Sequence, residues 1–416
     1  MKKSIIKFLL ILTLIFLHKV EIKADIVLPA ILSDNMVLQQ NTNVNIWGKA
    51  NKNEKITIKT SWSTLKYSTT ANSNGKWKLV LSTPEQTNQP QAITIIGNNT
   101  IHIKNILIGE IWLCSGQSNM DFPVAKDKGW RTGITNEEEE MRDASFPEIR
   151  LFHVAQKLSP EQELDDCEGE WMVCNSENLK EFSAVGYFFG KNLYQELQTP
   201  IGLIQSTWCG THAESWTSMQ EMIYDPVYAD LVAEFFNSKN NYTTDIKNYE
   251  LKLEEYNLSL KKGATTLKKP KKPNGIYHNK ALSTLWNAMI VPILPFTIKG
   301  VIWYQGESNS IRHQDHRYVF TKMINSWRKE WNQGDFPFYF VQIAPHYKQP
   351  PHIREAQLET WKSTRNTGMV VITDAADSTD IHPRHKQIPG ERLARWALAN
   401  TYGKNIPYSG PTYHSH

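Results

Sequence analysis

The stretch NILIGEIWLCSGQSNM, residues 105–120, decides the fold. Its apolar run from Ile106 to Cys114 is typical of a buried strand in a parallel sheet. The run breaks at a glycine-containing turn, and Ser118 stands where a helix would begin. A serine in this position has two interpretations. It can cap the next helix, or it can be a nucleophile held on a tight strand-to-helix turn, and the rest of the chain has to distinguish them.

Four later stretches repeat the strand pattern, and amphipathic helix patterns lie between them. This alternation predicts a three-layer α/β/α domain built on a parallel sheet. The predicted strands are PIGLIQS (200–206), GVIWYQG (300–306), FPFYFVQIA (336–344) and GMVVITD (368–374), and the clearest helix patterns cover 183–199, 318–332 and 353–363.

The segments around this domain have different patterns. Residues 25–105 contain short β-branched or alternating stretches with turn residues between them, which predicts a small all-β sandwich. The α/β domain then takes residues 106–403, and 404–416 form a tail. Within the domain, the lysine-rich residues 236–275 predict an exposed helix followed by a Pro/Lys loop. We interpret them as a solvated insertion, with a lid over a site as the alternative.

The chain begins like an exported protein. Residues 1–24 combine three early lysines, an apolar run and a small residue at Ala24, which predicts a signal peptide cleaved before Asp25. The mature protein would be periplasmic or secreted, with no membrane segment. The formal net charge is only +4 over 416 residues, and that mild balance does not favour a nucleic acid partner.

The four cysteines leave their pairing open. Export permits disulfides, and three full pairings are compatible with the sequence. Neither Cys-x-x-Cys nor His-Glu-x-x-His spacing occurs, so no metal site is predicted. The cysteines are Cys114, Cys167, Cys174 and Cys209.

Small or polar residues follow four of the predicted strands. Because ligands of open parallel sheets bind beyond the carboxyl ends of the strands, we expect a site there. The residues are Ser118; Gly210, Thr211 and Glu214; Gln305, Gly306, Glu307 and Asn309; and Asp374, Asp377, Asp380 and His382.

The residue types at these strand ends suit nucleophilic catalysis. A serine hydroxyl needs a base, and His382 is the best candidate because it follows the last strand. An attacked ester carbonyl becomes an oxyanion that needs donors already in place. The backbone amides of Ser118 and Gly210 are candidates, together with the side chain of Gln305 or Asn309; the alternative for these two amides is loop bracing. Rival histidines are His313, His316 and His385.

Four stretches of the chain, spanning about 108 to 400, together resemble the sialate O-acetylesterase family of the SGNH-type serine esterases. They are EIWLCSGQSNM (110–120), GLIQSTWCGTHAESW (202–216), LWNAMIVPILPFTIKGVIWYQGESN (285–309) and DIHPRHKQIPGERLARWAL (380–398).

The resemblance implies a site and a reaction. Ser118 would be the nucleophile and His382 the general base. The Ser118 amide, Gly210 and an amide side chain, Gln305 or Asn309, would donate to the oxyanion. The reaction implied is hydrolysis of O-acetyl esters on sialic acid or a sialoglycan, without a metal or organic cofactor.

Two positions depart from the family pattern. The usual acid lies three residues before the histidine, where this chain has Thr379, and Asp380 lies only two before it. In an extended segment Asp380 would point away from the His382 side chain, so a local turn is required. Otherwise the catalytic unit is a Ser–His dyad, with Asp374 and Asp377 as further orienting candidates. The second departure is Cys209, where relatives often have glycine.

The sequence leaves three functions open. The first is a sialate O-acetylesterase, and the second is an acetylesterase for another polysaccharide such as xylan. The third is a non-catalytic carbohydrate-binding protein on an esterase scaffold. A sialic acid site needs a cation for the carboxylate, and Arg131, Arg312 and Arg384 are the candidates. The oligomeric state is not predicted.

Overall fold

The computed structural model describes residues 25–411 except residues 128, 130 and 264. The predicted signal peptide, residues 1–24, lies outside the described residues, as does the end of the predicted tail. Over the described part of the chain, no helix is both long and apolar enough to cross a bilayer.

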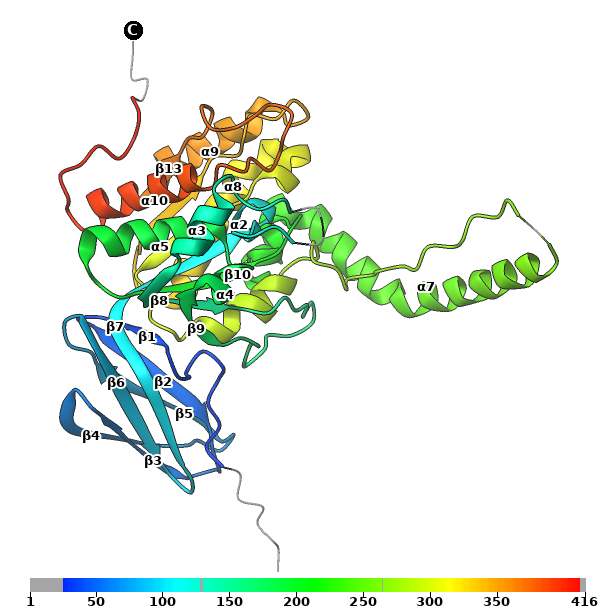
Figure 1. The fold of residues 1–416 in the computed structure, drawn as a ribbon. Coiled ribbons are helices and arrows are strands. Elements are labelled where there is room, and N and C mark those ends of the chain that lie inside the picture. The colour runs from blue at the N-terminus through cyan, green and yellow to red at the C-terminus, as the bar shows by residue number, and fades with distance from the viewer. Residues whose placement is uncertain (1–24, 128, 130, 264, 412–416) are drawn as a thin grey trace, which may run out of the picture.

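Figure 1 shows a sheet at the centre of the molecule. It is mostly parallel, and its strand order is β13-β12-β11-β7-β10-β8-β9. The strands predicted from the sequence are present, and two others, β8 and β9, had no clear sequence pattern. β9 is antiparallel to β8, whereas the other neighbours in this order are parallel. The bounds are β7 (Thr100–Gly116), β8 (Ser145–His153), β9 (Trp171–Asn175), β10 (Ile201–Thr207), β11 (Gly300–Tyr304), β12 (Phe338–Val341) and β13 (Thr367–Val370).

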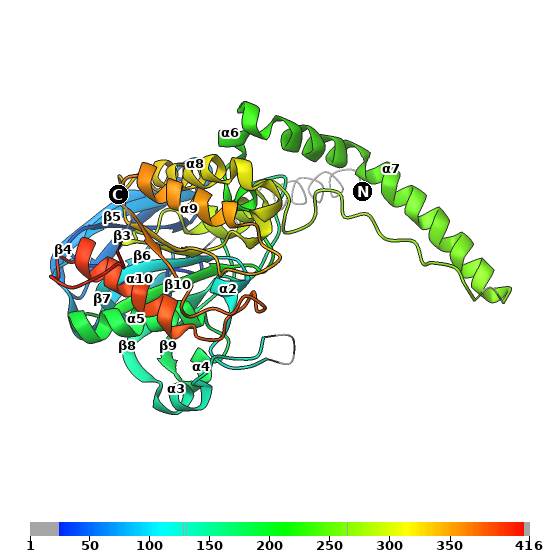
Figure 2. The same cartoon turned by 90° about the horizontal axis from the view of Figure 1, so that it is seen from above.

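Helices cover both faces of this sheet, which gives the predicted three layers (Figure 2). Helices α5 (Ala184–Leu197) and α10 (Gln387–Asn400) pack together on one face. Helices α8 (His313–Trp331) and α9 (Pro351–Ser363) lie on the other. The chain is therefore a mixed α/β protein with helices on both faces of a mostly parallel sheet.

Alternation along the strands separates the apolar core into two parts. On β11, Val301 and Trp303 belong to the core beneath α8, whereas Ile302 and Tyr304 belong to the core beneath α5 and α10. Successive side chains of a strand point to opposite faces, so a strand buried on both faces is apolar throughout. This burial explains the continuous apolar runs in the sequence.

In the described part of the chain, six strands precede β7. The first half of β7 pairs antiparallel with β6, and its second half enters the central sheet. One apolar core extends from Ile46 and Ile58 in the early strands to Trp303 in the central sheet. The predicted division at residue 105 thus falls within a strand, and a separate all-β domain remains a prediction. The early strands are β1 (Val37–Gln39), β2 (Asn43–Lys49), β3 (Lys55–Thr60), β4 (Ser63–Thr70), β5 (Lys76–Ser82) and β6 (Thr87–Ile96).

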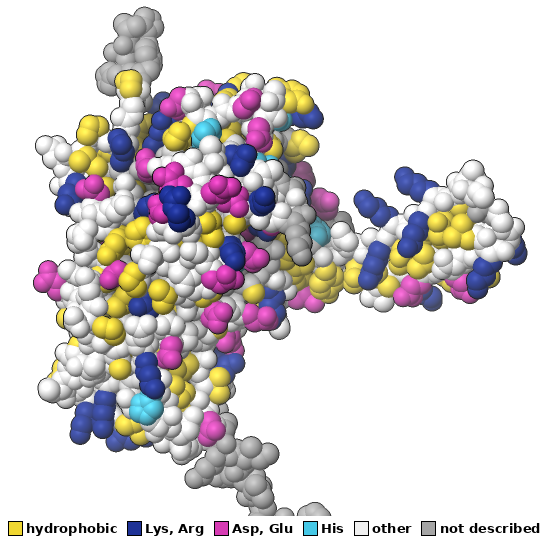
Figure 3. Space-filling model, viewed as in Figure 1, with side chains coloured by type: hydrophobic (Ala, Val, Ile, Leu, Met, Phe, Trp, Pro, Cys, Tyr) yellow, Lys and Arg dark blue, Asp and Glu magenta, His cyan; other side chains and the backbone are white. Residues whose placement is uncertain are grey.

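The long helix α7 (Ala229–Lys261) begins before the predicted lysine-rich insertion, residues 236–275, and continues into it. The helix projects from the body and is followed by an extended return segment (Figure 1). Most of its side chains are exposed, and Figure 3 shows charged side chains of both signs along it. The shorter elements are α2 (Ser118–Asp121), α3 (Glu137–Asp143), α4 (Ser176–Leu179), α6 (Met219–Met222), η1 (Ala213–Trp216), η2 (Pro226–Tyr228), η3 (Trp286–Ile290), η4 (Val291–Ile293) and η5 (Glu307–Arg312).

Candidate active site

Ser118 lies on a sharp turn at the carboxyl end of β7. The turn depends on Gly116, whose φ is +138° and where a Cβ atom would lie 2.2 Å from the carbonyl oxygen of Tyr304. Only glycine fits such a close approach at this φ. Ser118 then begins α2 with 6% of its surface exposed, so the hydroxyl is held at the edge of the sheet.

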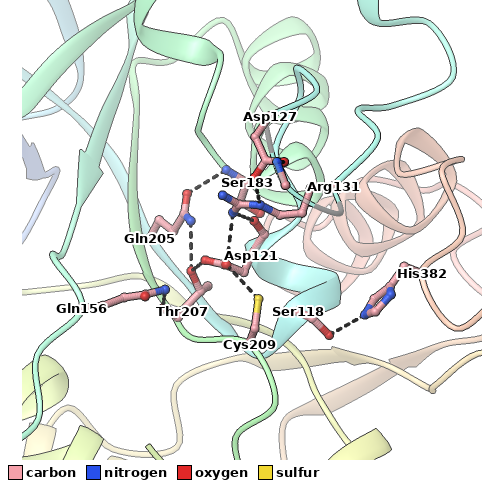
Figure 4. A network of polar contacts seen from close by, with 11 residues as sticks. Ser118, Asp121, Asp127, Arg131, Gln156, Ser183, Gln205, Thr207, Cys209 and His382 are labelled. Carbon is pink, nitrogen blue, oxygen red and sulfur yellow. Dashed lines mark hydrogen bonds and ion pairs between the residues drawn. The ribbon is translucent and has the colours of Figure 1, made fainter. Parts of the chain in front are cut away.

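His382 reaches this serine from the loop between β13 and α10. Its Nε2 lies 2.9 Å from the Ser118 Oγ (Figure 4). Burial and, to a smaller extent, the charge of Lys386 lower the pKa of His382 to about 4, against the opposing charge of Asp380. The imidazole is therefore neutral near pH 7, and in the tautomer with an unprotonated Nε2 it accepts the hydroxyl proton.

Asp380 is joined to His382 through the backbone. Its Oδ1 accepts the His382 backbone N–H at 2.8 Å. The local turn that the sequence required is present, since the Asp380 N–H donates to the Asp377 carbonyl at 3.2 Å. Asp377 bonds the backbone and hydroxyl of Thr379, and Asp374 forms an ion pair with Arg392. In these contacts, the carboxylates of Asp377 and Asp374 bind groups other than His382.

Gly210 lies beyond the end of β10, and no side chain of its own covers its backbone. Its φ is +69°, and among the described residues, apart from Gly210 and its two chain neighbours, no heavy atom comes within 4 Å of the position that a Cβ would take. The preceding thiol, Cys209 Sγ, donates to Asp121 Oδ2 at 3.1 Å. Figure 4 shows Cys209 turned toward Asp121. All four cysteines lie in the described part of the chain, and all are free thiols.

Asp121 ties the nucleophile turn to the end of β10. It is 3% exposed and accepts from the Thr207 hydroxyl at 2.5 Å as well as from Cys209 (Figure 4). Arg131 balances its charge at 3.3 Å. This network fixes the spacing between Ser118 and Gly210, although the sequence analysis had not singled out Asp121.

Gln305 and Asn309 brace the loops around the site. The Gln305 Nε2 donates to the Thr211 carbonyl at 3.0 Å and to Asn309 Oδ1 at 2.6 Å, which uses both amide hydrogens. Asn309 Nδ2 donates to the buried Glu214 at 2.8 Å. These contacts match the bracing alternative, and donation by either amide to an oxyanion remains a prediction.

The structure places the rival histidines elsewhere. The Nδ1 of His385 lies 3.3 Å from the Thr135 hydroxyl, and His313 stacks on His352. His316 is buried beside Phe320, where burial lowers its pKa to about 4. Of the histidines predicted as bases, His382 is the one that the structure brings to Ser118.

The three candidate arginines differ in what they contact. Arg131 pairs with Asp121 and Asp127, and Arg384 donates to two backbone carbonyls. Arg312 pairs with Glu214 through one guanidinium nitrogen and remains 29% exposed.

Comparison with known proteins finds carbohydrate esterases similar to this chain. Residues 258–400 match the family model described as carbohydrate esterase, sialic acid-specific acetylesterase. Over 347 residues, or 76% of this chain, it is 32% identical to sialate O-acetylesterase of Mus musculus and 33% identical to that of Homo sapiens. The chain spans 60% and 58% of the lengths of those two proteins, respectively.

A solved structure extends the likeness to most of the chain. The crystal structure of a carbohydrate acetylesterase from Xanthomonas citri superposes with a TM-score of 0.75 and 28% identity. The alignment covers 94% of this chain and 78% of that one. Together with the sequence matches, this superposition shows that most of the chain is similar to sialate O-acetylesterases and to a carbohydrate acetylesterase.

Proposed function

We propose that this protein is a serine esterase that hydrolyses O-acetyl esters of sialic acids through an acetyl-enzyme. The 2.9 Å contact between Ser118 Oγ and His382 Nε2 is the observation that carries the proposal. A neutral imidazole within hydrogen-bond distance of a serine hydroxyl is the arrangement that activates the hydroxyl as a nucleophile. The predicted signal peptide supports action outside the cytoplasm, in the periplasm or after secretion.

The first half of the reaction forms the acetyl-enzyme. The Ser118 Oγ attacks the acetyl carbonyl carbon while His382 Nε2 takes the hydroxyl proton. The carbonyl electron pair moves to oxygen, where the backbone amides of Ser118 and Gly210 are the proposed donors. When the tetrahedral intermediate collapses, the bond to the sugar oxygen breaks and His382 returns its proton to that oxygen.

The second half releases acetate. Water attacks the acetyl carbonyl as His382 Nε2 takes one of its protons, and a second oxyanion forms in the same place. Collapse breaks the bond to Ser118 Oγ, which regains a proton from His382. Both halves of the reaction therefore use the same proton acceptor, His382 Nε2, and the same oxyanion donors.

The charges beside the site support a sialic acid substrate. Arg312 lies at the end of η5, whose Ser308 N–H donates to Gln117 next to the nucleophile at 3.2 Å. Burial lowers the pKa of the nearby His212, the charge of Glu214 opposes that shift, and the charges of Lys280 and Arg312 reinforce it. Two cations thus act on the loop that carries Gly210, and a carboxylate on the substrate would complement them.

Acetate release from 9-O-acetylated sialic acid, measured for wild type and Ser118→Ala, tests the reaction. We expect the variant to remain folded and to lose turnover. Near-normal activity in Ser118→Ala would refute the assignment of the nucleophile.

Substrate choice is tested by comparing acetylated sialic acid with acetylated xylan. Arg312→Gln should raise the KM for the sialic acid about tenfold and leave the KM for xylan unchanged. Arg392→Gln is the matched control, because Arg392 also pairs with a carboxylate, that of Asp374. Activity on xylan alone would favour the polysaccharide esterase. Glycan binding without hydrolysis of any acetyl ester would favour the binding protein.

A further inference from the structure

A buried polar cluster lies directly behind the nucleophile. Asn119 follows Ser118 and is fully buried, and Glu307 and Lys386 are 6% and 1% exposed. Asn119 Nδ2 donates to Glu307 Oε1 at 2.6 Å, and Lys386 Nζ donates to Asn119 Oδ1 at 2.5 Å. The three residues come from α2, η5 and the residue before α10, so one cluster joins three strand ends of the site.

The same asparagine also holds the histidine loop. Its Nδ2 donates to the carbonyl of Ile381 at 2.9 Å, and Ile381 immediately precedes His382. The amide of Asn119 therefore uses both hydrogens and its oxygen. Helix capping does not account for this pattern, because each contact leads to another segment of the site.

The ammonium of Lys386 also lies against two aromatic rings. It lies 4.8 Å from the ring centre of Phe122 and 5.5 Å from that of Tyr304. Burial lowers the pKa of Lys386 to about 7, while Glu307 and Asp380 oppose that shift. Below neutral pH the side chain therefore carries a positive charge within the protein, where charges interact more strongly than in water.

We propose that Lys386 is a positioning residue: through Asn119 it aligns the nucleophile turn with the histidine loop, and its ammonium opposes a second positive charge on the His382 ring. This inference rests on the proposed function, in which Ser118 and His382 are the reacting pair. Lys386 itself touches neither the Ser118 hydroxyl nor a reacting atom in the proposed mechanism. Its effect passes through Asn119 and through the electric field at the imidazole.

The charged groups around His382 fix the direction of the effect. Lys386 and His346 lower its pKa, and Asp380 raises it. Glu307 acts on Lys386 rather than on the histidine. Removal of the Lys386 charge therefore leaves the attraction of Asp380 less opposed, and the pKa of His382 should rise.

The experiment measures kcat/KM for an aryl acetate against pH in wild type, Lys386→Met and Lys386→Gln. Both variants remove the charge, and glutamine retains a donor for Asn119. The acid limb should move up by about one pH unit, which is about tenfold lower activity on that limb. Lys386→Arg, which keeps the charge, should leave the limb near its wild-type position. Lys362→Met, at an exposed ion pair on α9, is the control.

A second readout is the NMR titration of the His382 ring, assigned by comparison with His382→Gln. The neutral variants should raise its titration midpoint together with the acid limb. The proposal would be overturned if Lys386→Met and Lys386→Gln fold but leave both the acid limb and the His382 titration midpoint unchanged. It would also be overturned if Lys386→Arg displaces the acid limb as far as Lys386→Met does. Activity retained by Ser118→Ala would refute the proposed function instead, while the His382 titration would still report the effect of Lys386.

Discussion

The carboxylate of Asp380 accepts the backbone N–H of His382, the residue whose ring contacts Ser118. The carboxylate of Asp380, two positions before the histidine, thus shapes the loop through a main-chain contact. An acid three positions before the histidine would be expected to hold the imidazole ring instead. The charge of Asp380 also raises the pKa of His382 against the effect of burial. Asp380 therefore contributes by loop geometry and by charge.

The first prediction separates these contributions of Asp380. Asp380→Asn keeps an oxygen for the His382 N–H and removes the charge, so we expect kcat to fall by about threefold and the acid limb to move to lower pH. Asp380→Ala removes both and should lower kcat about tenfold or more. Steady-state kinetics of the two variants beside His382→Ala provide the measurement. Equal losses in Asp380→Ala and His382→Ala would contradict a role mainly in positioning.

The second prediction concerns the pH dependence of the wild type. Because the pKa of His382 is lowered to about 4, the base form should persist well below the ordinary histidine pKa. The acid limb of kcat/KM should have its midpoint near the lowered value, because kcat/KM reports the free enzyme. A midpoint near 6.5, the ordinary histidine value, would show that burial does not control the base.

The third prediction concerns stability in acid. Burial lowers the folded pKa of both His316 and His382 to about 4. The unfolded chain binds their protons first, so their contribution to stability is fully present above pH 6.5 and is lost as pH falls toward 4. His316→Leu should reduce the fall in Tm between pH 7 and pH 4.5. His313→Leu, at the half-buried first position of α8, is the comparison.

The fourth prediction concerns the network beneath the nucleophile turn. Asp121→Ala removes the acceptor for Thr207 and Cys209 and leaves Arg131 without one of its two carboxylates. We expect kcat to fall at least tenfold because the Ser118 turn moves relative to Gly210, with a loss of stability of about 2 kcal/mol. Asp127→Ala, at the other carboxylate of Arg131, should have much smaller effects. Urea unfolding and initial rates for both variants give the test.

Much of the fold could be predicted because its strands are buried on both faces. The apolar runs that lead to Ser118 and to Gln305 could be interpreted as strands, because helix patterns lie between them in the sequence. β8 was missed because its first half, SFPEI, mixes polar and apolar residues, and only Ile149 to Phe152 are fully buried there. β7 was cut at residue 105 because Lys104 and Asn105 interrupt its pattern, although the strand continues through them.

The candidate site could be predicted only in part. Ser118, Gly210 and His382 follow strands, and strand ends are visible in the sequence. The roles of Asn119 and Lys386 depend on contacts across 267 positions of the chain, which no local pattern records. The sequence did contain a signal, since both residues lie within the stretches that carry the family resemblance, but it did not show that they meet.

β7 runs without interruption from Thr100 to Gly116 and so belongs to both sheets that it joins. The early strands are therefore connected to the serine turn by the backbone of a single strand. A version of this protein that starts at residue 106 would lose the β6 pairing and uncover Ile106 and Ile108, both of which are now fully buried. The early strands thus help to hold the nucleophile in place, even though none of their side chains enters the proposed chemistry.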